Sequence, residues 1–295
     1  MTTNDGDVIG RAQRILTTPF APNASILLLA EGYLLTDLGP GNLFAFHCAQ
    51  LVAHITNQPW YSPDLRLNIY SQDVSSTHQG ADVAAGCNLP PVTASTYFDA
   101  IYGDGGICRV LSGDETTVDY EATKIAGITL GQNAAFDAVI VLVNSAIYGG
   151  SSSGNIVWAP ARHPSFPDIA LHELGHFVGL HDEYGYRSNC RDKNKQWNGP
   201  NFAHANVDSS PDHPKWNLKV TQPLPTLLHP GRPACDSCYD PPDAVLAPYG
   251  IEIGTFEGSG WFHCGLYRPT AHCKMRKLQD PFCKICEGEL VAWLS

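Results

Sequence analysis

Two histidines and a glutamate in one short segment have the types and spacing needed to bind and use a metal ion. His172 and His176 stand four residues apart in the stretch PDIALHELGHFVGLHDEY, and Glu173 directly follows the first of them. On a helix, residues four apart lie on one face, so both imidazoles can reach the same ion. Glu173 then points beside that ion, where its carboxylate can take a proton from a water molecule that the metal activates. The pattern predicts a catalytic zinc site with Glu173 as the general base.

A third ligand is expected just beyond this helix. Gly179 comes three residues after His176, and Asp182 comes three residues after Gly179. In the pattern H-E-x-x-H-x-x-G-x-x-H, the glycine ends the helix in a left-handed turn that brings the last residue back to the metal. A carboxylate oxygen is also an acceptable zinc ligand, so we assign that position to Asp182. His181 is the alternative, but the spacing favours Asp182.

Three residues farther along the chain are candidates for a supporting role. Met275 is the only methionine besides Met1, and it could form the apolar floor that lies under the ion in metzincins. The alternative is that Met275 only fills space in the core. Tyr267 and Tyr184 could each donate a hydrogen bond to the oxyanion of the transition state. For both tyrosines the alternative is a packed aromatic side chain without a catalytic role.

The elements that must position these residues are predicted from apolar periodicity. Residues 25–30 and 136–143 are continuous apolar runs of strand length, and residues 65–69 alternate between apolar and polar. Between residues 25–30 and 65–69, apolar residues recur over 44–55 with the spacing of an amphipathic helix. This alternation predicts an α/β (α+β) fold with a mixed, mostly parallel sheet and helices packed on it.

The segment before the metal helix is predicted to contain an edge strand. Residues 149–154 are glycine- and serine-rich and are expected to form a flexible loop. A short strand follows, ends at Pro160 and is expected at the edge of the sheet. The residues of this strand are Asn155, Ile156, Val157, Trp158 and Ala159.

The composition changes after the metal helix. Residues 185–250 are rich in proline, glycine, asparagine and aspartate and show little apolar periodicity. We therefore expect one catalytic domain made of two subdomains. Residues 1–179 would form an αβ subdomain that ends in the metal helix. Residues 180–295 would form an irregular, cysteine-rich subdomain that carries Met275 in a methionine turn.

Ten cysteines favour an oxidising compartment, and their pairing is left open. Disulfides in the second subdomain are the favoured interpretation, with free buried thiols as an alternative. A further zinc site is also conceivable, made by the C-x-x-C pairs at Cys235 and Cys238 and at Cys283 and Cys286. The first residues do not have the pattern of a signal peptide. The cysteine count nevertheless favours a secreted or extracellular mature form whose signal peptide was removed, with a cytoplasmic protein as the alternative.

Charge and hydropathy narrow the possible partners. The 295-residue chain has a formal net charge of −11, which disfavours binding to the phosphate backbone of nucleic acids. It has no apolar run of about 18 residues or more, so we expect no segment that crosses a membrane. We expect a monomer that acts on a polypeptide and holds one catalytic zinc ion. The sequence leaves calcium binding open.

The stretch HELGHFVGLHDEY resembles the signature of the bacterial IgA-peptidase-like family of zinc metallopeptidases, a metzincin-like group with an aspartate as third ligand. Further similar stretches are LLAEGY (28–33), LNIYSQDVSSTHQGAD (67–82), GTFEGSGWFHCGLYRPTAHCKMR (254–276) and DPFCKIC (280–286). The resemblance covers the chain from about residue 20 to its end. It implies a zinc endopeptidase whose cleft runs over the metal helix, but it does not imply that immunoglobulin A is the substrate. In that fold the strand before the metal helix lies along the cleft, so the resemblance implies that residues 155–159 could pair with an extended substrate. An edge strand without a ligand is the alternative.

Two other functions stay open at this point. The chain could be a peptide- or glycan-binding module that keeps a zinc site without cleaving its ligand. It could also be an amidase that uses the same zinc chemistry on cell-wall peptides. The intact Glu173 argues against the binding module, because an enzyme that has decayed to a binding module usually loses its general base first.

Overall fold

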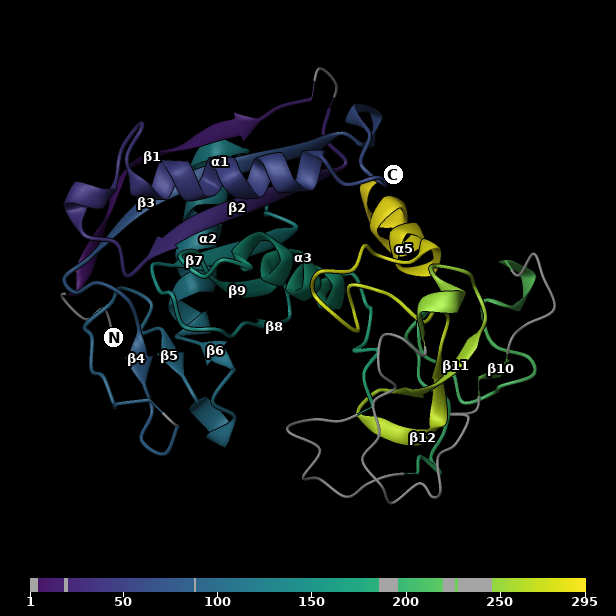
Figure 1. Cartoon of the computed structure of the whole chain (residues 1–295). Coiled ribbons are helices and arrows are strands. Elements are labelled where there is room, and N and C mark those ends of the chain that lie inside the picture. The colour runs from purple at the N-terminus through teal and green to yellow at the C-terminus, as the bar shows by residue number, and fades with distance from the viewer. Residues whose placement is uncertain (1–4, 19–20, 88, 186–195, 220–225, 228–245) are drawn as a thin grey trace. The chain divides into compact units, whose positions relative to one another are not determined.

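Uninterrupted apolar runs form the centre of the main sheet. Every residue of β2 (Ala24–Glu31) and β7 (Ala138–Val143) is buried, as expected for strands that are covered on both faces. The structure is a computed structural model that describes residues 5–18, 21–87, 89–185, 196–219, 226–227 and 246–295 (Figure 1). Both runs are therefore strands, as the sequence predicts.

The main sheet has six strands in the order β1-β3-β2-β7-β9-β8. Strands β3, β2, β7 and β9 run parallel to one another, and β1 and β8 pair antiparallel at the two ends. The prediction of a mixed, mostly parallel sheet is confirmed. The four strands not yet delimited are β1 (Gly6–Leu16), β3 (Leu67–Ser76), β8 (Ser151–Ser153) and β9 (Ile156–Pro160).

Helices cover both faces of this sheet. Ser71 and Asp73 of β3 line a cavity together with residues of α1, whereas Gln72 lines another cavity with residues of α2. Successive side chains of a strand point to opposite faces, so α1 and α2 lie on opposite sides of the sheet. The third helix, α3, packs against α1 and β9. The helices are α1 (Leu43–Thr56), α2 (Glu115–Thr129) and α3 (Phe166–Phe177).

The predicted edge position of residues 155–159 is wrong. Strand β9 pairs with β7 on one side and with β8 on the other, where Ser151 lies opposite Trp158 and Ser153 lies opposite Ile156. The backbone of β9 is thus occupied on both sides, and an extended peptide cannot pair with it. The glycine- and serine-rich residues 149–154, predicted to be a flexible loop, contain the true edge strand, β8.

By their internal contacts the residues form two compact units. The N-terminal unit comprises Met1–Phe177 with Trp293–Ser295, and the C-terminal unit comprises Val178–Ala292. The N-terminal unit also contains a small sheet of β4 (Asp82–Val83), β5 (Ile101–Tyr102) and β6 (Leu111–Ser112). The elements delimited in the C-terminal part of the chain are β10 (Thr226–Leu227), β11 (Thr255–Ser259), β12 (Phe262–Arg268) and α5 (Lys284–Leu294).

Asp208 connects several segments of the C-terminal unit through hydrogen bonds. The carboxylate of Asp208 accepts hydrogen bonds from the side chain of Asn201 and from the backbone N–H groups of Ser210 and Lys215. The backbone of Asp208 also pairs with that of Tyr267. The division into functional subdomains at residues 179 and 180 stays a prediction.

Some of the described cysteines form disulfides and others are free thiols. Cys87 and Cys108 form a disulfide in the N-terminal unit, and Cys264 is also disulfide-bonded. Cys48, Cys273, Cys283 and Cys286 are buried free thiols. Cys235 and Cys238, which the sequence offered for a second zinc site, lie outside the described residues. Among the described helices, none combines the length and apolarity needed to cross a membrane.

Candidate active site

The core contacts of α3 fix the direction of its two histidines. Leu171 and Leu174 are fully buried, so this face of the helix is held against the rest of the N-terminal unit. His172 and His176 follow on consecutive turns, with ring centroids 4.9 Å apart and ring planes at 90°. The structure therefore brings the two imidazoles together, as the four-residue spacing predicts.

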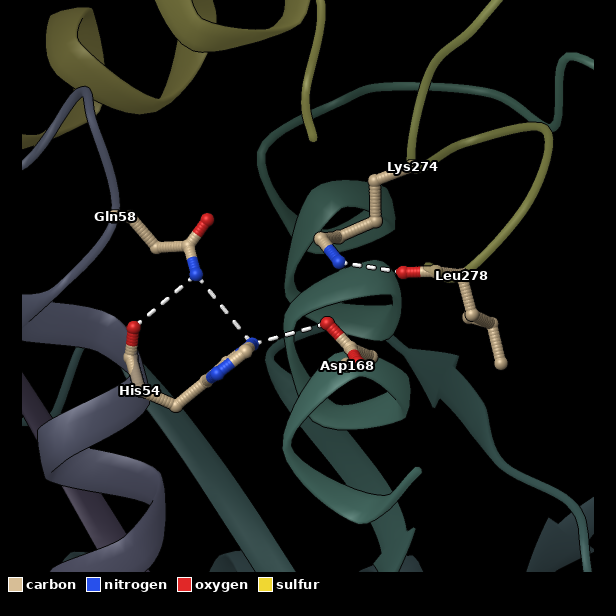
Figure 2. Close-up of polar contacts among 5 residues, drawn as sticks. All are labelled: His54, Gln58, Asp168, Lys274 and Leu278. Atoms are coloured by element: carbon tan, nitrogen blue, oxygen red, sulfur yellow. Dashed lines mark hydrogen bonds and ion pairs between the residues drawn. The ribbon is translucent and has the colours of Figure 1, made fainter. Parts of the chain in front are cut away.

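Helix α1 fixes the beginning of α3. His54 Nε2, in the last turn of α1, lies 3.0 Å from Asp168 Oδ1 in the first turn of α3 (Figure 2). The side-chain amide of Gln58 lies 3.4 Å from the same imidazole nitrogen and donates to the carbonyl of His54 at 3.1 Å. A carboxylate in the first turn also suits the helix dipole. These contacts anchor the helix that carries both histidines.

Gly179 ends the helix in the predicted way. Helix α3 stops at Phe177, and Gly179 has a φ of +88°, a left-handed conformation that favours glycine. Asp182 follows and is buried, with only 4% of its surface exposed. Trp261 Nε1 donates a 2.7 Å hydrogen bond to Asp182 Oδ2, and the Gly260 N–H donates to the Asp182 carbonyl. The turn between β11 and β12 thus holds both the carboxylate and the backbone of Asp182.

The donor set suits a metal ion. Along the continuous stretch from His172 to Asp182, these two residues and His176 each offer one ligand atom, and the three atoms lie within 4.8 Å of one another. Two imidazoles and a carboxylate are common zinc ligands. A carboxylate ligand whose other oxygen accepts a hydrogen bond, as Asp182 accepts one from Trp261, is typical of metal sites. The residues present therefore fit a bound divalent ion.

His181 has different surroundings. Its ring packs edge-on against those of Phe202, His204 and Trp261, with centroids 5.1, 4.9 and 4.9 Å away. Its backbone N–H donates to the side chain of Asn206, which in turn donates to the His181 carbonyl. His181 is thus part of an aromatic cluster in the C-terminal unit.

Glu173 lies beside the edge strand of the main sheet. A Cβ atom added at Gly150, the residue before β8, would stand 3.1 Å from Glu173 Oε1 and 2.8 Å from Ile169 Cγ2. A side chain at position 150 would therefore collide with α3. The absence of a side chain at Gly150 lets the backbone of the edge strand approach the carboxylate closely.

Met275 sits in a tight turn next to the segment that contains Asp182. The N–H groups of Arg276 and Lys277 both donate to the Cys273 carbonyl at 2.9 Å, which closes the turn around the fully buried Met275. The Met275 carbonyl accepts a 2.8 Å hydrogen bond from the N–H of Glu183. The position of this methionine under a metal ion stays a prediction.

The two candidate tyrosines lie in the C-terminal unit. Tyr267 is buried in β12, and burial raises the pKa of its phenol, as do the nearby carboxylates of Glu257 and Asp212. The carbonyl of Tyr184 accepts a hydrogen bond from the N–H of Trp261, and its ring is partly exposed. A role of either tyrosine at the oxyanion stays a prediction.

Residues 15–231 match the family model for IgA Peptidase M64, which covers most of the chain. The chain belongs to this family. As an M64 peptidase it is a hydrolase of peptide bonds with a polypeptide substrate, and membership in a metallopeptidase family indicates a bound metal. The M64 assignment agrees with the metal-binding donor set on and after α3. No curated protein matches the chain.

Sequence reasoning missed the residues that support this site. Trp261 and Asn206 carried no motif, because their roles depend on contacts with residues far away in the chain. The sequence did contain a signal for one other feature, the pair Cys283-x-x-Cys286. In the structure, Cys283 and Cys286 lie beside Glu183 and Cys273.

Proposed function

We propose that this M64 peptidase is a zinc metalloendopeptidase in which His172, His176 and Asp182 hold the ion and Glu173 is the general base. The observation that carries the proposal is the grouping of these two imidazoles and one carboxylate along a single continuous segment, with their ligand atoms within 4.8 Å. Three protein ligands leave a coordination position for water or substrate, as in catalytic zinc sites.

Each residue then has a distinct task. A bound zinc ion would polarise the scissile carbonyl and make water more acidic. Glu173 would accept the proton of the attacking water at its carboxylate and deliver it to the nitrogen of the leaving amine. Its place next to Gly150, the residue before the edge strand β8, supports this role. The aromatic packing of His181 supports Asp182 as the third ligand.

The remaining parts of the site follow the metzincin pattern. Met275 would form the apolar floor of the site, and its hydrogen-bonded turn next to Glu183 supports this role. Tyr267, or in its place Tyr184, would donate a hydrogen bond to the oxyanion. Residues 1–179 and 180–295 would be the two subdomains of one catalytic domain.

We further propose that β8, and not residues 155–159, binds the substrate. Strand β8 ends the described six-stranded sheet, and its side chains are partly or fully exposed. An extended peptide that adds to a sheet edge gains backbone hydrogen bonds without requiring a specific sequence. The N–H of Gly150, the residue before β8, already donates to the Arg109 carbonyl, so the peptide would pair with Ser151–Ser153. It would pass close to Glu173, because Gly150 lies against that carboxylate.

The compartment and assembly are proposed on separate grounds. The disulfide between Cys87 and Cys108 and the disulfide-bonded Cys264 favour an oxidising, extracellular location. A net charge of −11 disfavours nucleic acid as a partner. We propose that the enzyme acts as a monomer away from the membrane, with one catalytic zinc ion.

One experiment separates this function from its alternatives. The purified chain is incubated with denatured casein, a fluorescent peptide library and peptidoglycan, each with and without a zinc chelator. The proposal predicts chelator-sensitive cleavage of casein and library peptides, with new termini inside the chains. Release of products from peptidoglycan alone would contradict it in favour of the amidase. Chelator-sensitive binding without cleavage would contradict it in favour of a binding module.

A further inference from the structure

Four potential metal ligands meet in the interior of the C-terminal unit, apart from the site described above. Glu183, Cys273, Cys283 and Cys286 each offer one ligand atom, and these atoms lie within 4.8 Å of one another. All four residues are at most 1% exposed. They come from three separate parts of the chain: the segment after Gly179, the Met275 turn and the beginning of α5.

The separations between these atoms match a tetrahedral zinc site. Cys273 Sγ lies 3.7 Å and Cys283 Sγ lies 3.5 Å from Cys286 Sγ, and Glu183 Oε1 lies 3.3 Å from the same sulfur. With zinc–sulfur bonds of about 2.3 Å, two sulfurs of a tetrahedral site are about 3.7 Å apart, and a sulfur and a carboxylate oxygen are about 3.5 Å apart. The sulfurs are too far apart for a disulfide, which requires about 2.0 Å.

The surroundings are those of a ligand set that carries negative charge. The Cys283 N–H donates to Cys273 Sγ at 3.4 Å, and Asn206 Nδ2 donates to Glu183 Oε1 at 3.0 Å. Hydrogen bonds of this kind orient thiolate and carboxylate ligands in metal sites. One buried cation, Arg268, interacts electrostatically with Glu183.

Without a metal ion this cluster is hard to explain. Asn206 donates to Glu183 Oε1, but the other carboxylate oxygen, Oε2, is buried and accepts no hydrogen bond from the described residues. A buried carboxylate oxygen without a donor is costly. Thiols are weak hydrogen-bond partners and cannot offset that cost. A divalent ion with three thiolate ligands and one carboxylate ligand would satisfy all four groups at once, and the thiol protons would pass to solvent as it binds.

We propose that Glu183, Cys273, Cys283 and Cys286 bind a structural zinc ion, separate from the catalytic one. Thiolate ligands in tetrahedral geometry, two of them in a Cys-x-x-Cys pair, are typical of structural zinc. Four protein ligands close the site to water, so it has no catalytic role. The ion ties the residue next to Asp182 to the Met275 turn and to the first turn of α5. It therefore holds in place the backbone that presents Asp182.

The proposal is tested on the full chain, purified without reducing agent or chelator. Elemental analysis should find two zinc ions per chain. X-ray absorption at the zinc edge should show zinc–sulfur scattering at about 2.3 Å. The double variant His172→Ala/His176→Ala should keep one zinc ion with a larger share of sulfur scattering. This variant separates the two sites, because loss of the catalytic ion leaves the structural one in place.

Cysteine variants provide a second measurement. Cys273→Ser and Cys286→Ser should lose one zinc ion, whereas Cys48→Ser, which removes a buried free thiol of the N-terminal unit, should keep both. If the cysteine variants do not fold, titration of the wild-type chain with a mercurial thiol reagent should release one zinc ion. The proposal is overturned if the wild-type chain shows only nitrogen and oxygen scattering. It is equally overturned if mass spectrometry finds a disulfide between any two of the three cysteines.

Discussion

Gly150 lies against the side chain of Glu173, so that a Cβ atom added at position 150 would stand 3.1 Å from Glu173 Oε1. This contact connects the edge strand of the sheet with the residue that we propose as general base. It requires glycine at position 150 for a steric reason, not for the flexibility that a glycine- and serine-rich sequence suggests. The relationship can be tested by substitution at position 150.

Gly150→Ala should lower kcat by roughly 10- to 100-fold, because a catalytic group displaced by about 1 Å loses much of its effect. Zinc content should stay unchanged, since the three atoms nearest to the added Cβ belong to Ile169 and Glu173 and not to a proposed ligand. Gly127→Ala is the matched control, because a Cβ at Gly127 in α2 meets nothing within 4 Å. Normal turnover of Gly150→Ala would show that Glu173 tolerates displacement and would argue against its role as base.

The third ligand can be identified with a pair of variants. Asp182→Ala should weaken zinc binding by more than about 100-fold, because loss of a ligand exceeds the effect of its supporting groups. His181→Phe keeps an aromatic ring among Phe202, His204 and Trp261 and should leave zinc affinity nearly unchanged. Competition with a chromogenic chelator measures both affinities. Equal zinc affinities in the two variants would remove Asp182 from the ligand set.

The hydrogen bond from Trp261 to Asp182 should strengthen zinc binding. Trp261→Phe removes the donor to Asp182 Oδ2 but keeps a ring in the turn, and we expect zinc affinity to fall roughly 10- to 100-fold. Trp216→Phe is a suitable control, since it removes a buried indole donor that bonds to the Gly254 carbonyl instead. The same titration compares the two variants. An unchanged affinity in Trp261→Phe would mean that this bond does not orient Asp182.

Binding of substrate to β8 predicts a pattern along the peptide. Alternate residues of an extended strand direct their N–H groups toward a neighbouring strand. A series of substrates with one N-methylated amide each should therefore lose kcat/KM at every second position near the scissile bond. Each lost hydrogen bond should reduce kcat/KM by roughly 3- to 10-fold. A uniform response along the series would exclude pairing with a sheet edge.

The sequence predicted the elements whose apolar pattern is long and regular. The buried runs of β2 and β7 and the amphipathic α1 are strands and a helix as expected, because burial decides their structure. Strand β8 could not be predicted in this way. Its three serines have no apolar pattern, and the strand exists because its backbone pairs with β9. The same pairing made the edge assignment of residues 155–159 wrong.

The residues of the candidate site also differ in how far the sequence predicts them. Residues within one turn of α3 or just beyond it, from His172 to Asp182, are close in the chain, so their spacing alone brings them together. Trp261 reaches Asp182 from 79 residues farther along, and Cys286 reaches Glu183 from 103 residues farther along. Contacts between residues so far apart in the sequence depend on the whole fold of the C-terminal unit, so a local sequence pattern does not predict them.

The most direct test of the account is the variant Glu173→Gln, which keeps the size of the side chain but removes its basicity. Zinc content and peptide turnover are measured on the same preparation, with the wild-type chain in parallel. We expect wild-type zinc content, an unchanged thermal unfolding midpoint and a loss of turnover of roughly 10²- to 10⁴-fold. Normal turnover with zinc bound would contradict the account, because Glu173 could not then be the general base.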